Sequence, residues 1–199
     1  MSSLAYRRGS PAAWLLLAVL MSVLQPVSAD IRIELEGVDG DLRRNVLALL
    51  SLERYQDRDR LQPDAVQRLY NRIDDEVRSA LRPYGYYEPI ISSSISGPDK
   101  DRHWHVKITI EPGTPVLIAR VSIRIDGPGA EDAVFKRLTA DPPLRSGQRL
   151  SHAIYDQYKG SLERAAATYG YLDARMLRSE MQVDRDAYLA TIQLQLDTG

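Results

Sequence analysis

The sequence contains no cysteine, so neither disulfide bonds nor thiol chemistry contributes to this protein. That absence excludes a cysteine nucleophile and a cysteine-based metal site. The formal net charge is only −1, which argues against the strongly basic surface that nucleic-acid binding requires. The G-x-S-x-G, phosphate-loop and H-E-x-x-H motifs of common enzymes are missing too. We therefore expect a protein that is not an enzyme, with no catalytic residues, no cofactor and no metal.

Long apolar runs are also absent, except near the N-terminus. Residues 12–24 form an apolar stretch behind two arginines, and small residues precede Asp30. The stretch is shorter than the roughly 20 residues that a membrane-spanning helix needs. This arrangement predicts a signal peptide over residues 1–29, cleaved between Ala29 and Asp30, with an uncleaved N-terminal anchor as the alternative. We expect the exported chain to reside in the periplasm.

After the signal peptide, one order of elements occurs twice. Alternating apolar residues predict half-buried strands, and apolar residues at helical spacing predict helices that pack on a sheet. The first copy has a strand over 31–37, helices over 41–52 and 63–84, and strands over 90–96 and 103–110. The second copy has a strand over 121–127, helices over 131–138 and 151–169, and strands over 171–183 and 187–197. We therefore predict two domains, 30–113 and 114–199, joined by a short, proline-stiffened segment.

A Tyr-Gly-Tyr sequence stands at the same place in each copy, where the second helix meets the second strand. Glycine adopts a left-handed helix cap at little cost. We therefore predict that these residues are structural caps, in which the first tyrosine is buried, the glycine ends the helix and the second tyrosine opens the strand. The residues are Tyr84, Gly85, Tyr86, Tyr169, Gly170 and Tyr171. In the second copy, the strand alternation changes phase near Leu177, which indicates a β-bulge.

The order of the elements also predicts how each sheet is built. The second and third strands are separated by a short turn, so they pair antiparallel. The third strand has the cleanest alternation, which places it in the middle, parallel to the first. The predicted fold class is α+β: two tandem β-α-α-β-β domains, each a three-stranded mixed sheet with two helices on one face.

Two recurring motifs carry a resemblance to a known family. Each copy opens with alternating apolar residues that end in glycine, at 31–37 and 121–127, and each has Gly-Tyr before its second strand. The chain resembles the POTRA (polypeptide-transport-associated) domains of the outer-membrane assembly family. The junction 110–127 and the helix positions Tyr155, Lys159 and Leu162 are most similar to the N-terminal periplasmic part of TamA-type proteins.

The resemblance implies a function in protein assembly at the outer membrane. TamA-type proteins carry three such domains and a membrane β-barrel, so we expect this sequence to be a fragment or a truncated product that lacks the third domain and the barrel. The implied role is a periplasmic scaffold for outer-membrane protein and autotransporter assembly. The implied partners are a TamB-like inner-membrane protein and unfolded outer-membrane proteins. The alternatives are the POTRA region of a two-partner-secretion channel and a hydrolase with a hidden site.

The second strand of the first copy is the candidate binding site. Its position at a sheet edge leaves backbone groups free to pair with an extended peptide. The strand carries no charge that would oppose such pairing, and it consists of Ile90, Ile91, Ser92, Ser93, Ser94, Ile95 and Ser96. Two weaker candidates are interpreted as structural: the pair His103 and His105 as a solvated strand face, and the mixed-charge segments 57–60 and 184–186 as turns.

Overall fold

The computed structural model describes residues 31–55, 62–100 and 103–199. The predicted signal peptide, its Ala29–Asp30 cleavage site and the mixed-charge segment 57–60 lie outside these ranges. Within the part of the chain described, no helix is both long and apolar enough to cross a membrane.

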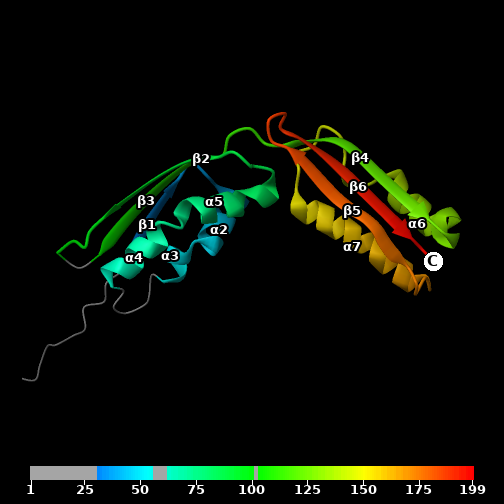
Figure 1. Ribbon diagram of the computed structural model, residues 1–199, viewed down its shortest axis with the longest axis horizontal. Helices are drawn as coiled ribbons and strands as arrows, with labels where there is room; N and C mark the ends of the chain where they lie inside the picture. Colours follow the sequence, from blue (N-terminus) through cyan, green and yellow to red (C-terminus); the bar gives the residue numbers. More distant parts are fainter. Residues whose placement is uncertain (1–30, 56–61, 101–102) are drawn as a thin grey trace, which may run out of the picture.

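The elements fall into two groups along the chain (Figure 1). The first group contains β1 (Ile31–Glu36), α2 (Gly40–Leu49), α3 (Ser51–Arg54), α4 (Pro63–Tyr70), α5 (Ile73–Leu81), the 3-10 turn η1 (Arg82–Tyr84), β2 (Ile90–Ser96) and β3 (Trp104–Glu111). The second contains β4 (Leu117–Asp126), the 3-10 turn η2 (Pro128–Glu131), α6 (Ala133–Ala140), α7 (His152–Thr168), β5 (Arg175–Asp184) and β6 (Leu189–Asp197). We call them the first and second units; the domain boundary between residues 113 and 114 stays a prediction.

Each unit has one three-stranded sheet with the predicted topology. The strand orders are β1-β3-β2 and β4-β6-β5, so the last strand of each unit lies in the middle. The middle strand pairs parallel to the first strand and antiparallel to the second in both sheets. The predicted bulge is also confirmed, because the β5–β6 register shifts between Met176 and Arg178.

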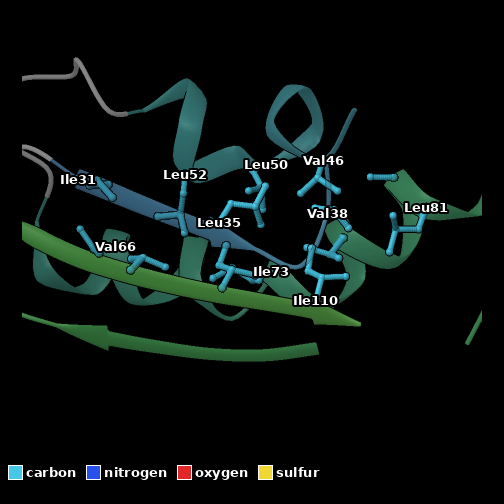
Figure 2. Packing of buried hydrophobic residues seen from close by; sticks show 14 residues of the cluster. Ile31, Leu35, Val38, Val46, Leu50, Leu52, Val66, Ile73, Leu81 and Ile110 are labelled. Atoms are coloured by element: carbon cyan, nitrogen blue, oxygen red, sulfur yellow. The ribbon is translucent and has the colours of Figure 1, made fainter. Parts of the chain in front are cut away.

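The first core lies between the sheet and the helices, which cover one face of it (Figures 1 and 2). The alternation of the strands places Ile31, Leu35, Val106, Ile108 and Ile110 against apolar side chains of the helices. Figure 2 shows Val46, Leu50 and Leu52 from α2, α3 and their junction meeting Ile73 and Leu81 from α5. The alternating apolar residues of the strands and the helically spaced apolar residues of the helices are therefore buried in the same core.

The helices of the first unit are more broken than predicted. The predicted helix over 63–84 divides into α4, α5 and η1, and the predicted helix over 41–52 divides into α2 and α3. At the first break, the Arg72 backbone N–H bonds to the Leu69 carbonyl, a 3-10 spacing that tightens the turn beside Asn71. At the second, the start of α3 is fixed by the Glu76 carboxylate, which accepts from the Ser51 backbone N–H at 2.7 Å.

The second core forms around Phe135, Leu162 and the inward face of β6, where Ala190, Ile192, Leu194 and Leu196 are buried as the alternation predicts. Ser151 caps α7 by accepting from the Ile154 N–H at 3.4 Å, in the place expected for a helix start. The first strand of this unit begins at Leu117, four residues before the predicted start at 121. Its extension is held by hydrogen bonds from Leu117 N–H to Tyr188 and from Ile118 N–H to Gln148.

Candidate peptide-binding edge

β2 lies at the edge of the first sheet, in the range predicted from the sequence. Within the described residues it pairs only with β3, from Ile90 opposite Glu111 to Ser96 opposite His105. Ile91 and Ile95 pack against the core, and the serines are exposed. One side of the strand therefore anchors it while its outer backbone edge has no strand partner.

The four edge strands of the two sheets differ in charge. β1 contains Arg and two Glu residues, β4 contains two Arg and an Asp, and β5 contains two Arg, a Glu and an Asp. β2 contains no charged residue. Charged side chains on an edge strand oppose pairing with another chain. Among the strands that the structure describes, β2 is thus the edge best suited to accept an extended peptide.

The charges on β1 are engaged across the sheet. The Lys107 ammonium on β3 lies 2.8 Å from the Glu36 carboxylate, and this hydrogen bond lowers the pKa of Glu36. Glu34 lies farther from the same ammonium, at 3.8 Å. A strand that paired with β1 would have to approach this row of charges, whereas β2 presents only serine and isoleucine.

Two side chains from the helices reach backbone carbonyls of β2 and of the residue just before it. The Tyr70 hydroxyl, at the end of α4, donates to the Ser93 carbonyl at 2.9 Å, and it accepts from the Ser93 hydroxyl at 3.1 Å. The Arg78 guanidinium, on α5, donates from Nη1 to the Pro89 carbonyl at 3.1 Å. Two hydrogen bonds to the Asp74 carboxylate, at 2.6 and 3.2 Å, hold that guanidinium in place. The sequence predicts a helix over 63–84, which contains both donors, but it gives no signal for either contact.

The histidine pair lies at the start of β3, with His103 just before the strand and His105 within it, opposite Ser96. The Asp99 carboxylate accepts from the His103 backbone N–H at 2.7 Å and lies 3.0 Å from His105 Nε2. No group of three metal-ligating side chains is assembled among the described residues. These contacts tie Asp99, which follows β2, to the start of β3.

The first Tyr-Gly-Tyr segment lies against the second unit. Gly85 is left-handed, with φ of +86°, and its carbonyl accepts from the Val116 N–H at 2.8 Å. The Arg149 guanidinium lies over the Tyr86 ring, 5.6 Å from its centroid. The hydroxyl of the next residue, Tyr87, lies 2.8 Å from His152 Nε2. This segment, residues 84–87, therefore forms the joint between the two units.

Burial at the joint also affects protonation. Desolvation lowers the pKa of His152, and the nearby Asp156 carboxylate opposes that shift. The folded chain therefore favours the neutral imidazole, which can share one hydrogen bond with the Tyr87 hydroxyl without placing a charge in the joint.

The second Tyr-Gly-Tyr segment corrects the prediction that its first tyrosine is buried. Tyr169 is 56% exposed, so it is not buried as predicted. Gly170 has the same φ of +86°, and the turn it makes places Tyr171 inward, where its ring lies 5.9 Å from that of Phe135. The Tyr171 hydroxyl donates to the Asp132 carboxylate at 2.5 Å. The side chain after the glycine, rather than the one before it, is the structural anchor here.

The first segment also departs from the predicted cap. Tyr84 is half-buried and not part of the fully buried core. Neither Tyr86 nor Tyr171 opens a strand, because β2 begins at Ile90 and β5 begins at Arg175. The residues between each glycine and its strand form a short connection, and in the first unit the joint contacts fix this connection.

Replacing these tyrosines with alanine is expected to give unequal losses of stability. Tyr171→Ala removes a ring packed on Phe135 together with a hydrogen bond, so we expect a loss of about 3 kcal/mol in unfolding free energy. Tyr169→Ala changes an exposed residue, so we expect a change within about 0.5 kcal/mol. Urea unfolding monitored by circular dichroism measures both. Equal losses in the two variants would contradict the assignment.

The family comparison concerns the first unit, and the solved structures align with most of the chain. Residues 32–112 match the family model described as POTRA domain TamA domain 1. Among solved structures, BamA POTRA3-5 from Haemophilus influenzae aligns at 14% identity, over 86% of this chain and 66% of that one, with a TM-score of 0.48. BamA from Haemophilus ducreyi lacking POTRA domains 1-3 aligns at 15% identity, over 85% of this chain and 29% of that one, with a TM-score of 0.41. POTRA1-2 of Omp85 from Anabaena aligns at 16% identity, over 86% and 94%, with a TM-score of 0.37.

Proposed function

Because residues 32–112 match the family model described as POTRA domain TamA domain 1, we propose that this chain acts as a periplasmic scaffold in a TamA-like outer-membrane assembly factor. Its role is to hold other polypeptides and not to carry out a reaction. The substrates are outer-membrane proteins, autotransporters included, in their unfolded state. The observation that carries the proposal is the uncharged edge strand β2, residues 90–96.

Strand addition is the binding mode that this edge supports. An incoming extended segment pairs through its main chain, so it needs no particular sequence. The strands of outer-membrane barrels alternate apolar and polar residues over about ten positions, which makes them good strand formers. An edge that reads the main chain is therefore suited to many barrel proteins, and affinity for a flexible peptide should be weak, about micromolar or poorer.

The hydrogen bonds from the helices indicate which residues face outward. Along an antiparallel edge strand, the N–H and C=O groups of alternate residues point away from the paired strand. The Pro89 and Ser93 carbonyls both receive helix side chains and lie four residues apart. We infer that Ile91, Ser93 and Ile95 present the free edge, and that Ser92 and Ser94 bond to β3.

Proline substitutions are expected to separate these two sets. Ser93→Pro removes an outward N–H, so the fold should survive while peptide binding falls at least about threefold, the loss expected for one hydrogen bond. Ser94→Pro removes an N–H that bonds to β3, so it should lower the unfolding temperature of the first unit. The measurement is NMR titration with a soluble ten-residue peptide of alternating valine and threonine flanked by lysines, together with thermal unfolding.

The titration also tests the proposed function. Amide shifts concentrated in residues 90–96 of the unmodified chain support it. Shifts confined to the helix surfaces, or undiminished binding by a folded Ser93→Pro variant, would exclude β2 as the site. Destabilisation by Ser93→Pro rather than Ser94→Pro would reverse the assignment of the two faces.

A TamB-like inner-membrane protein is the partner that we propose for the same region. Its extended segments could pair with the same uncharged edge, since strand addition makes little demand on side chains. Such a partner and an unfolded substrate would then compete for β2.

A further inference from the structure

We propose that Tyr70 and Arg78 are gate residues of the β2 edge: they occupy backbone acceptors that an incoming strand would use, and a strand must displace them to bind. This inference rests on the proposed function and adds its regulation. The proposal rests on two hydrogen bonds. Side chains from two different helices donate to the carbonyls of Ser93 in β2 and of Pro89 just before it.

Tyr70 is the better-held member of the pair. Its ring packs partly against the first core, so the hydroxyl is directed towards β2 by apolar contacts that do not depend on the hydrogen bond. The hydroxyl both donates to the Ser93 carbonyl and accepts from the Ser93 hydroxyl. It therefore lies beside the central residue of the strand, where an added strand has to pass.

Arg78 covers the residue that immediately precedes β2. Asp74, one turn earlier on α5, fixes the guanidinium with two hydrogen bonds and leaves Nη1 free for the Pro89 carbonyl. Four residues of strand span about 13 Å, so the two gate residues cover acceptors about that far apart. A strand that binds the whole edge meets both.

The gate sets a threshold for binding. A short or poorly extended segment gains too few main-chain bonds to replace the two that the helices supply, whereas a long barrel strand also pairs at Ile91 and Ile95. The same cover protects an uncharged edge from pairing with a second copy of this chain, a hazard that the other edges avoid by charge. Selectivity then comes from the length and extension of the substrate rather than from its side chains.

The test removes the donor and keeps the ring. Tyr70→Phe should bind the valine-threonine peptide about 2- to 10-fold more tightly than the unmodified chain, because one competing hydrogen bond is gone. Tyr70→Phe with Arg78→Met should tighten binding further. Tyr188→Phe, on the β5–β6 turn of the second unit, is the matched control and should leave affinity unchanged. A second readout is the ¹³Cζ signal of Tyr70, which should shift as peptide saturates the unmodified chain.

The outcomes distinguish failure of the gate from failure of the proposed strand addition. Peptide shifts in residues 90–96 with equal affinity in Tyr70→Phe and an unmoved Tyr70 signal overturn the gate and leave strand addition standing. Weaker binding by folded Tyr70→Phe also overturns it, because the hydroxyl then assists the peptide. No shift in 90–96, even in the double variant, overturns both. Binding that occurs only after Tyr70 is replaced supports a gate that is closed to this peptide.

Discussion

Gly37→Ala is expected to destabilise the first unit by about 4 kcal/mol or more, which is at the upper end for a single substitution. Gly37 follows β1 and has φ of +86°, a conformation that side chains disfavour. A Cβ atom at this position would lie 1.9 Å from the Ile110 carbonyl oxygen and 2.9 Å from its carbon. Both are backbone atoms of the central strand β3, so relief requires moving the strand end away from the sheet.

Thermal unfolding measures the effect, since 1 kcal/mol shifts the melting temperature of a domain of this size by about 4–8 °C. Gly40→Ala is the matched control, three residues along the same segment. Gly40 also has positive φ, +54°, but a Cβ there meets nothing within 4 Å. Its loss should be limited to the backbone term of about 1–2 kcal/mol. Similar melting temperatures for the two variants would refute the close approach as the cause.

The second large effect is expected at the joint between the units. Gly85→Ala places a Cβ 2.7 Å from the Leu150 carbonyl oxygen and 3.4 Å from that of Val116, both in the second unit. Gly170→Ala meets nothing within 4 Å, although both glycines have φ of +86°. The shared backbone strain cancels in the comparison. We expect Gly85→Ala to cost about 2 kcal/mol more than Gly170→Ala, the usual size for a core clash.

The two variants should also differ in how rigidly the two units are held relative to each other. With the joint opened, residual dipolar couplings of the two units should no longer fit one common alignment in Gly85→Ala, while Gly170→Ala keeps the couplings of the unmodified chain. A single alignment in a folded Gly85→Ala variant would mean that the remaining contacts, Arg149 on Tyr86 and Tyr87 with His152, suffice to hold the units together.

The sheets were predictable because the strands obey simple local rules. Alternation in β1, β3 and β6 identifies their buried faces, and the short β2–β3 and β5–β6 connections require antiparallel pairing. With the central strand assigned by its clean alternation, the parallel pairing of β1 follows. The bulge at Leu177 was visible as well, since a slipped register moves every later side chain to the other face.

The tyrosines and the strand start at Leu117 were not predictable in the same way. Whether Tyr169 or Tyr171 turns inward is decided by Phe135, which lies on α6, and Asp132, which lies between η2 and α6, both far away in sequence. The extension of β4 back to Leu117 depends on a hydrogen bond to the Tyr188 carbonyl and pairing with Arg149. Such choices arise from tertiary contacts, which the local pattern does not contain.

The candidate site likewise has one feature that could be predicted from the sequence and one that could not. The missing charge in β2 is a property of the sequence, and comparison with the other edges needs only the strand assignments. The Tyr70 and Arg78 contacts depend on how far each side chain extends around the sheet edge. A tyrosine in an apolar stripe predicts a buried ring, but the partner of its hydroxyl is set by the folded geometry.

The place of the central strand has a consequence for how the chain folds. In each unit the strand that joins the other two is the last in the sequence, and contacts such as Thr109 with Glu36 join residues 73 positions apart. Until β3 is in place, β1 and β2 have no strand partner in the first sheet, so the sheet edge that β2 forms does not yet exist. Each sheet therefore closes in one late step, and contacts of such long range make that step slow compared with helix formation.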